Sequence, residues 1–285
     1  MYTRGRKEAK GKTGPTARRK QRGWKDLKKP TGRRKPKDQE KKIQRRMIDF
    51  GIIAAGDGNR IKEEGSLVAK PLVKIQGEPM IGRLISIMEK CGAKSVSVLV
   101  NSDMPEVVEY LERLTPTLNC ELRFTSTKTP SSMHSFHELL NIMKPTGKFV
   151  ITTVDTIFRE EDFRNYVEFF TNSPHDIDGV MGVTSFIDDE KPLYVEVEGR
   201  HRIVAYLDEA FPGVKYVSAG IYGLQTSAFP VLQECVASGV SRMRNFQRKL
   251  IQKGLNLDAY DLGKVLDVDH IGDIAKADEF LASGK

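Results

Sequence analysis

A glycine-containing turn followed by an arginine is the first segment whose residue types and spacing could do chemistry. The run from Phe50 to Ala55 is short and apolar, which is typical of a buried parallel strand. Residues 54–60, AAGDGNR, begin where that run ends. Ligands of an open α/β sheet bind beyond the carboxyl ends of its strands, and glycines there let backbone N–H groups approach phosphate oxygens. Arg60 could donate two parallel hydrogen bonds to a phosphate, although a glycine pair alone is more often a structural turn.

A carboxylate stands at the corresponding place after a second apolar run. Residues 149–154, FVITTV, predict a buried strand that leads directly into Asp155. A carboxylate at the carboxyl end of such a strand is well placed to bind Mg²⁺, and a turn or helix-cap aspartate is the alternative. The five histidines show no HExxH spacing, and GxSxG, GxGxxG and GxxxxGK[ST] are absent. These absences argue against zinc and serine hydrolases, dinucleotide-binding proteins and P-loop proteins.

The residues between these two points are specific enough to indicate a family. Residues 70–75, KPLVKI, are followed by residues 77–81, GEPMI, which open a predicted helix. A strand followed by A-A-G-x-G-x-R, K-P-L and G-x-P-M-I resembles the nucleotidyltransferases that make nucleotide sugars, a superfamily that includes the MobA-like NTP transferases. The resemblance covers residues 47–285. It implies a Rossmann-like, doubly wound mixed sheet of the nucleotide-diphospho-sugar transferase type.

The resemblance also implies roles for the motif residues. In this family the arginine and lysine hold the leaving pyrophosphate, which assigns catalytic roles to Arg60 and Lys70. The glycine loop wraps the nucleotide phosphates, and a later loop contacts the base or ribose. The nucleotide-binding residues implied are Ala54, Ala55, Gly56, Asp57, Gly58, Ser131 and Ser132. For the two serines, capping of the following helix is an open alternative.

A divalent cation, Mg²⁺ or Mn²⁺, is the cofactor that the resemblance implies. Asp155 resembles the metal-binding aspartate of the family, and residues 266–269, LDVD, look like its late D-V-x-T-P-E-D segment. Asp267 matches the first aspartate of that segment and is the expected second ligand. His270 to Gly272 replace the usual T-P-E, which leaves open whether Asp267 or Asp269 completes the site.

The acceptor pocket is the part of the family pattern that this chain matches least. Residues 218–222, SAGIY, look like the strand that lines this pocket, so Gly220 and Tyr222 are the expected acceptor-binding residues. Many sugar-specific members carry an E-K-P lysine before that strand, whereas residues 207–210 here are LDEA. The basic candidates to replace it are Lys191, Arg200, Arg202 and Lys215. The basic run 241–248 could bind an acidic ligand or be a solvated helix face.

The elements that must position these residues alternate between strand and helix up to about residue 172. Strands are expected at residues 50–55, 72–75, 95–100, 122–126 and 149–154, with helices near 81–91, 107–114, 131–143 and 163–170. This alternation predicts a mostly parallel sheet with helices on both faces. Residues 180–186, 194–197, 203–207 and 216–224 then predict a small antiparallel substrate subregion. Helices near 228–237 and 241–253, a strand near Val265 and a helix at 271–281 complete the expected domain, residues 47–285.

The charge is distributed unevenly along the chain. Residues 1–46 hold 20 Lys/Arg and 4 Asp/Glu, so the remaining residues hold 26 basic and 34 acidic side chains within a total of +8. The basic segment has few apolar side chains, which predicts disorder. It is either a nucleic-acid-binding arm or the product of a start misassigned upstream of Met47.

The sequence thus predicts a Mg²⁺-dependent nucleotidyltransferase of the EC 2.7.7 type. The reaction expected from the resemblance transfers a nucleoside monophosphate from a nucleoside triphosphate to a sugar 1-phosphate, forming an NDP-sugar and pyrophosphate. One alternative is a MobA-like or other alcohol-phosphate acceptor; another is a non-catalytic nucleotide sensor with a nucleic-acid-binding arm. Three widely spaced cysteines and the lack of a 20-residue apolar run favour a reducing cytoplasm and no membrane partner. The base and the acceptor remain open.

Overall fold

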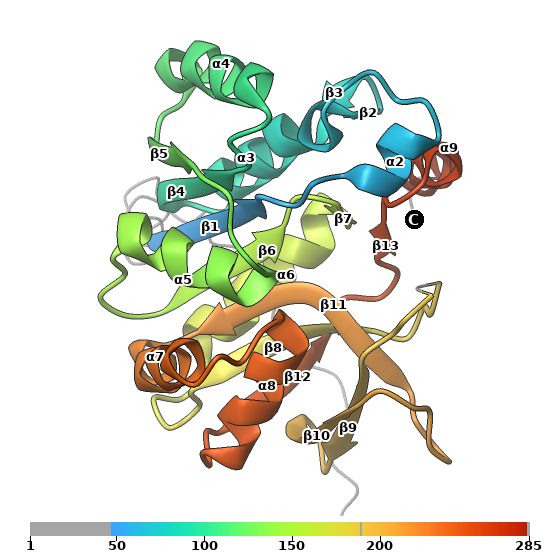
Figure 1. The fold of residues 1–285 in the computed structure, drawn as a ribbon. Coiled ribbons are helices and arrows are strands. Elements are labelled where there is room, and N and C mark those ends of the chain that lie inside the picture. The colour runs from blue at the N-terminus through green and yellow to red at the C-terminus, as the bar shows by residue number, and fades with distance from the viewer. Residues whose placement is uncertain (1–46, 189, 284–285) are drawn as a thin grey trace, which may run out of the picture.

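A nine-stranded sheet runs through the centre of the molecule (Figure 1). The computed structural model describes residues 47–188 and 190–283; the predicted basic tail, residues 1–46, lies outside the described residues. In the order β5-β4-β1-β6-β11-β8-β12-β10-β9, the strands are β5 (Glu121–Ser126), β4 (Ala93–Val100), β1 (Ile48–Ala54), β6 (Phe149–Thr153), β11 (Tyr216–Leu224), β8 (Gly179–Thr184), β12 (Leu257–Asp261), β10 (Arg202–Leu207) and β9 (Tyr194–Glu198).

The sheet is mixed, and its two halves are continuous. β1 pairs in parallel with both β4 and β6, and β4 pairs in parallel with β5. β11 is antiparallel to both of its neighbours, β6 and β8, while β12 is parallel to β8. The doubly wound mixed sheet is therefore confirmed. The expected antiparallel subregion is formed by β9, β10 and β11 at the far half of the same sheet rather than as a separate unit.

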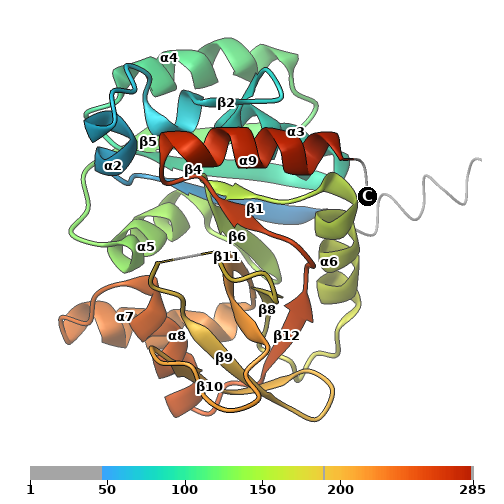
Figure 2. The same ribbon diagram turned by 90° about the vertical axis from the view of Figure 1, so that its right-hand side faces the viewer.

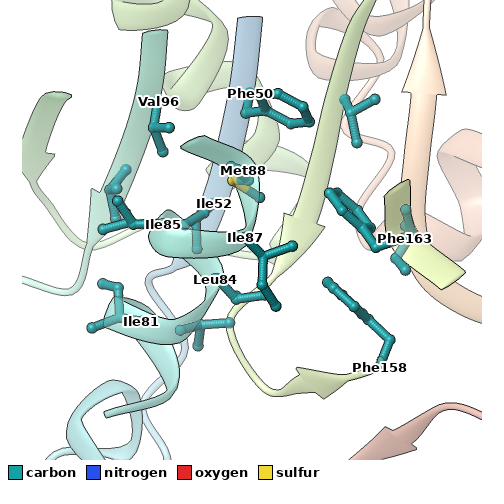
Figure 3. Close-up of a cluster of buried hydrophobic side chains, with 14 of the residues drawn as sticks. Phe50, Ile52, Ile81, Leu84, Ile85, Ile87, Met88, Val96, Phe158 and Phe163 are labelled. Atoms are coloured by element: carbon teal, nitrogen blue, oxygen red, sulfur yellow. The ribbon is translucent and has the colours of Figure 1, made fainter. Parts of the chain in front are cut away.

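Helices cover both faces of the sheet (Figures 1 and 2). One face carries α3 (Met80–Lys90), α4 (Pro105–Leu114) and α6 (Glu160–Asn172), and the other carries α5 (Ser132–Met143), α7 (Phe229–Ala237) and α8 (Met243–Gln252). Successive side chains of a strand point to opposite faces. Phe50 and Ile52 of β1 accordingly join the first apolar cluster, where they lie near Leu84 and Phe163 (Figure 3), and Ile53 joins the second.

A third, smaller cluster ties the end of the chain to its beginning. α9 (Ile271–Ala282) packs against the short pair β2 (Lys74–Ile75) and β3 (Glu78–Pro79), with Ile61 of α2 (Asn59–Glu63) in the same cluster. Figure 1 shows α9 beside α2. Another two-stranded pair, β13 (Leu266–Asp267) with β7 (Thr156–Ile157), lies next to the main sheet. These small elements bring the late aspartates to the carboxyl end of β6.

Local departures from the sequence expectations have simple causes. The start of the strand expected at residues 72–75 belongs to a 3-10 turn, η1 (Lys70–Leu72), and only the two-residue β2 follows, because the N–H groups of Leu72 and Val73 donate back to Ala69 and Lys70. The short elements α2, β7 and β12 were not predicted, nor were the 3-10 turns η2 (Thr115–Thr117) and η3 (Thr226–Ala228). Across the described ranges, no helix is both long and apolar enough to cross a membrane.

Candidate active site

The loop after β1 is held in place by a residue that follows the neighbouring strand, β4. Asn101, directly after β4, donates from its side-chain amide to the backbone oxygen of Ala55 at 3.3 Å and to Oδ1 of Asp57 at 2.9 Å. Asp57 and Gly56 are exposed, while Ala54 and Ala55 are buried. The sequence argument missed Asn101, although a polar residue directly after an apolar strand was a usable signal.

Gly58 brings this loop against Lys70. It precedes α2 with a φ of 61°, a conformation that glycine adopts without steric cost. A Cβ atom at this position would lie 3.0 Å from Cβ of Lys70. The second glycine of the motif therefore allows close packing of the loop on the motif lysine.

Lys70 is the centre of an ion-pair network. Its Nζ atom lies 2.6 Å from Oδ2 of Asp155 and 2.7 Å from Oδ1 of Asp269. The other oxygen of Asp269 contacts a guanidinium nitrogen of Arg60 at 2.5 Å. The side chain of Lys70 is 11% exposed, that of Asp155 is 25% exposed and that of Arg60 is 53% exposed. The network thus joins the two predicted catalytic cations, Lys70 and Arg60, to Asp155 after β6 and to Asp269 near the end of the chain.

The network fixes the charge states of its inner members. Burial alone would lower the pKa of Lys70, but the carboxylates of Asp155 and Asp269 outweigh it and raise that pKa above its ordinary value. Burial would likewise raise the pKa of Asp155, but the ammonium group of Lys70 and a hydrogen bond from Thr153 hold it below its usual range. Both groups are therefore charged at neutral pH.

Asp155 and Asp267 are brought together by the β7–β13 pair. Asp267 is the register partner of Thr156, and the backbone N–H of Val268 donates to the backbone oxygen of Asp155 at 3.1 Å. Both aspartates line one open pocket with a volume of about 540 Å³, and Asp269 lines it as well. The two residues expected to bind a metal therefore share a site, although 112 positions separate their numbers in the sequence.

The same pocket contains four of the other predicted contact residues. Ser131, Ser132, Gly220 and Tyr222 all line it. Arg60 lines a neighbouring pocket of about 220 Å³ that shares Asp267 and Asp269. Within the described part of the chain, the lining of the larger pocket does not include Ala54 to Gly58 or Lys70, although Gly58 lies close to Lys70.

The two serines bind the start of α8 rather than cap their own helix. The hydroxyl oxygen of Ser131 accepts a hydrogen bond from the backbone N–H of Arg242, and that of Ser132 accepts one from Met243, both at 3.1 Å. Ser131 occupies the N-cap position of α5 without a side-chain capping bond. The capping alternative is therefore wrong for Ser131; the nucleotide-binding role of both serines stays a prediction.

Gly220 and Tyr222 face the aspartates from β11. Gly220 has a φ of 69°, and a Cβ atom there would lie 3.0 Å from the hydroxyls of Thr153 and Thr156, which are hydrogen-bonded to each other at 2.7 Å. Burial, followed by the charges of Asp267 and Asp155, raises the pKa of Tyr222. The phenol is therefore a neutral hydrogen-bonding group on the pocket wall.

Two arginines at the start of α8 contribute positive charge to the large pocket. Arg242 and Arg244 line the large pocket. The lining does not include the four basic residues that the sequence suggested as replacements for the E-K-P lysine, Lys191, Arg200, Arg202 and Lys215. Two basic residues of the run 241–248 thus line the pocket, and the function of the run stays a prediction.

Comparisons with known proteins agree with this geometry. The family model of the MobA-like NTP transferase domain matches residues 51–213. The bifunctional protein GlmU of Methanococcus maripaludis is 25% identical over 236 residues, which cover 81% of this chain and 53% of that protein. The chain thus spans about half the length of the curated relatives it matches.

Solved structures show the same fold. The inositol-1-phosphate CTP transferase from T. maritima superimposes with a TM-score of 0.68 at 18% identity, covering 83% of this chain and 98% of that one. The nucleoside-diphosphate-sugar pyrophosphorylase from Vibrio cholerae gives 0.63 at 16% identity, covering 81% and 99%. With its glycine loop, its motif lysine and its mixed sheet, this chain belongs to the family of MobA-like NTP transferase domains.

Proposed function

We propose that this chain transfers a nucleoside monophosphate from a nucleoside triphosphate to a phosphorylated small molecule and releases pyrophosphate. The observation that carries the proposal is the pairing of acids and cations in one site. Asp155 and Asp267 line a single pocket, and Lys70 links Asp155 to the Asp269–Arg60 pair. A site of this composition suits a polyphosphate and its counter-charges.

The reaction requires one bond to form and one to break. An oxygen of the acceptor phosphate attacks the α-phosphorus in line, and the bond from the α-phosphorus to the oxygen bridging to the β-phosphate breaks. The electron pair leaves with pyrophosphate. The acceptor phosphate is already an anion at neutral pH, so the step needs no general base. Positioning and charge neutralisation are the main contributions left to the protein.

In this proposal Lys70 and Arg60 neutralise the leaving pyrophosphate. The raised pKa of Lys70 suits that task because the ammonium group stays charged at any physiological pH. The backbone of residues 54–58, together with Ser131 and Ser132, would hold the nucleotide. Gly220 and Tyr222 would contact the acceptor, since both lie in the pocket wall beside the aspartates.

A divalent cation, Mg²⁺ or Mn²⁺, is part of the proposal, and the donor chemistry fits it. In the described residues no group of three or more His, Cys, Asp or Glu is arranged to enclose a metal ion. Mg²⁺ is commonly held by one or two carboxylates together with substrate phosphates and water rather than by an all-protein cage. Asp155 and Asp267 could supply those carboxylates. A bound cation would offset phosphate charge at the reacting α-phosphate.

A sugar 1-phosphate is the acceptor that we propose. The support comes from proteins with the same fold: the V. cholerae structure is that of a nucleoside-diphosphate-sugar pyrophosphorylase. Inositol 1-phosphate is the second candidate, because the T. maritima structure is that of an inositol-1-phosphate CTP transferase. Both acceptors offer a phosphate monoester as the nucleophile.

The test is pyrophosphate release by the purified full chain. Each common nucleoside triphosphate would be combined with glucose 1-phosphate, other sugar 1-phosphates or inositol 1-phosphate, with Mg²⁺ or with excess EDTA. One triphosphate–acceptor pair should give Mg²⁺-dependent pyrophosphate release, and Asp155→Asn should lower turnover by about a hundredfold or more.

The controls separate enzyme from sensor. A variant of a distant surface charge, Arg113→Ala in α4, should leave turnover unchanged because Arg113 is 69% exposed and pairs only with Glu109 of its own helix among the described residues. Tight nucleotide binding without pyrophosphate release for any pair would contradict the proposal and favour a nucleotide-sensing protein.

A further inference from the structure

Glu64, the residue that directly follows α2, joins this helix to the start of α9. One of its carboxylate oxygens accepts a hydrogen bond from the backbone N–H of Ile271 at 2.7 Å, and the other contacts Nδ1 of His270. Figure 2 shows α2 beside the end at which α9 begins. Glu64 belongs to none of the motifs that carry the family resemblance. Its contacts therefore call for an explanation of their own.

Arg60 is bound to the same late segment, one turn earlier in the chain. A guanidinium nitrogen of Arg60 contacts Asp269 at 2.5 Å. The backbone N–H of Glu64 donates to the backbone oxygen of Arg60 at 3.1 Å, which is the spacing of one helical turn. Residues four positions apart on a helix lie on the same face. One face of α2 thus contacts residues 269–271 at two points, through a cation and through a carboxylate.

The short helix α2 depends on such contacts for its position. It has five residues, of which Ile61 is buried, and a helix of this length is not stable by itself in water. The loop that follows offers little support, because the side chain of Leu67 is fully exposed. The placement of Arg60 therefore depends on the burial of Ile61 and on the two contacts with residues 269–271.

The two contacts differ in what happens to them during the proposed reaction. A phosphate that binds Arg60 competes with Asp269 for the same guanidinium group. The partners of Glu64 are a backbone N–H group and the ring of His270, and neither is assigned to nucleotide, acceptor or metal. The Glu64 contact can therefore persist while substrate is bound, when the Arg60–Asp269 contact is weakened.

We propose that Glu64 is a positioning residue that fixes α2 against the start of α9 and thereby holds Arg60 beside the phosphates of the nucleotide. The proposal rests on the proposed function, because it concerns a cation assigned to the leaving pyrophosphate. Glu64 acts through Arg60 and contacts no reacting atom. His270, its partner, is the first of the residues that replace the T-P-E of the family pattern, so this contact uses residues particular to this chain.

Pyrophosphate binding to the full chain tests the proposal without requiring turnover. Calorimetry with magnesium pyrophosphate as the probe would compare wild type, Glu64→Ala, Arg60→Ala and the double variant. Each single variant should bind about tenfold more weakly than wild type, and the double variant should bind no more weakly than Arg60→Ala. A residue that acts through Arg60 has no effect once Arg60 is absent, whereas a general loss of structure would add to that of Arg60→Ala.

Glu64→Gln is the conservative variant. Its amide oxygen can still accept the N–H of Ile271, so it should recover part of the affinity that Glu64→Ala loses. His270→Ala is less informative, because Nε2 of His270 also lies 3.7 Å from a carboxylate oxygen of Glu190. A change at His270 would therefore disturb two contacts at once.

Asp278→Ala is the matched control. Asp278 of α9 accepts the backbone N–H of Gln76 at 2.6 Å, and so joins the same helix to the turn between β2 and β3 instead of to α2. Both Asp278→Ala and Glu64→Ala should lower stability in urea unfolding, since each loses a carboxylate that accepts a backbone N–H. Asp278→Ala should nevertheless keep the wild-type affinity for magnesium pyrophosphate.

Steady-state kinetics provide a second measurement. In Glu64→Ala, kcat/KM for the nucleoside triphosphate should fall about tenfold, while the KM for the acceptor stays at the wild-type value. A parallel change in both parameters would indicate a disturbed pocket rather than a displaced Arg60, and would overturn the positioning role.

The binding outcomes separate this proposal from the proposed function. Wild-type pyrophosphate affinity in Glu64→Ala, an undiminished effect of Glu64→Ala in the Arg60→Ala background, or an equal loss in Asp278→Ala would each reject the positioning role and leave the transferase intact. Pyrophosphate binding that depends on Glu64 through Arg60, without pyrophosphate release from any triphosphate–acceptor pair, would reject the transferase and keep the positioning role. A wild type that does not bind magnesium pyrophosphate would overturn both.

Discussion

Lys70 and Asp269 are 199 positions apart in the sequence, and their side chains lie 2.7 Å apart. Asp269 also contacts Arg60 with its second carboxylate oxygen. One carboxylate therefore holds both cations to which we assign the leaving pyrophosphate. This makes Asp269 a positioning residue in the proposed mechanism, a role distinct from that of Asp155 and Asp267.

Replacing Asp269 should disturb those cations without removing a proposed metal ligand. In Asp269→Asn the side chain keeps its shape but loses its charge, so Lys70 and Arg60 are held less firmly. We expect kcat/KM for the nucleoside triphosphate to fall about tenfold to a hundredfold. The Mg²⁺ concentration giving half-maximal rate should stay near the wild-type value. Steady-state kinetics at several Mg²⁺ concentrations measure both quantities.

Asp267→Asn is the matched comparison for this prediction. It should shift the Mg²⁺ requirement upward, because we assign Asp267 to the cation. If the two variants instead showed the same shift in Mg²⁺ requirement, the division of roles between the late aspartates would be wrong.

Much of this fold could be predicted because buried parallel strands have a distinctive composition. β1 and β6 are mostly apolar and buried, and they end at Ala54 and Thr153, so the loops that follow them could be located as ligand-binding ends. β12, with the sequence LDAYD, has two aspartates and a tyrosine among its five residues and gave no such signal. α2 has only five residues, too few for helical periodicity to be recognised.

The residues of the candidate site could be predicted from the sequence, but the contacts between their side chains could not. Motif spacing indicated Arg60, Lys70, Asp155 and Asp267, but it carries no information on which carboxylate meets which cation. That pairing depends on the β7–β13 register and on α9 packing beside α2, which are long-range features. The two hydrogen bonds at the start of α8 depend on serine hydroxyls from the start of α5, and no local pattern encodes them.

The Lys70–Asp155 pair should behave as a coupled unit. In Lys70→Met the carboxylate of Asp155 loses its nearest opposite charge, and we expect a destabilisation of roughly 1–3 kcal/mol, reduced from that of a fully buried pair because Asp155 is 25% exposed. The double variant Lys70→Met with Asp155→Asn should regain much of this stability while staying inactive. Urea unfolding of all four combinations gives the coupling free energy.

An additive result would contradict that prediction. If the two substitutions destabilised the protein by independent amounts, the 2.6 Å contact would contribute nothing measurable to stability. Activity is measured separately, because each single variant should lose turnover whether or not the two substitutions have additive effects on the free energy of unfolding.

Gly220 should tolerate no side chain, for two separable reasons. Its φ of 69° costs an alanine about 1–2 kcal/mol, and the added Cβ would also press on the hydroxyls of Thr153 and Thr156 at 3.0 Å. Thr153 hydrogen-bonds the carboxylate of Asp155, so Gly220→Ala should reduce both stability and turnover. Thermal unfolding and pyrophosphate release would be measured together.

Gly199→Ala provides the matched control for Gly220→Ala. Gly199 has a φ of 61°, and its Cβ would meet nothing within 4 Å. It should therefore show the backbone cost without the crowding and keep full turnover. Equal losses of stability and unchanged turnover in both variants would mean that the threonine contacts are not important.

The thiol of Cys91 should make stability depend on pH on the alkaline side. Burial raises the pKa of this thiol from 9.0 to about 11. Above pH 9 the unfolded chain releases the thiol proton while the folded protein keeps it, so the free energy of unfolding falls as pH rises towards 11. The loss attributable to this group is at most about 3 kcal/mol.

Cys91→Ala removes the group, so the stability difference between wild type and variant should shift against wild type between pH 9 and 11 and stay constant below pH 8. A difference that does not change with pH would show that the thiol is solvated in the native state.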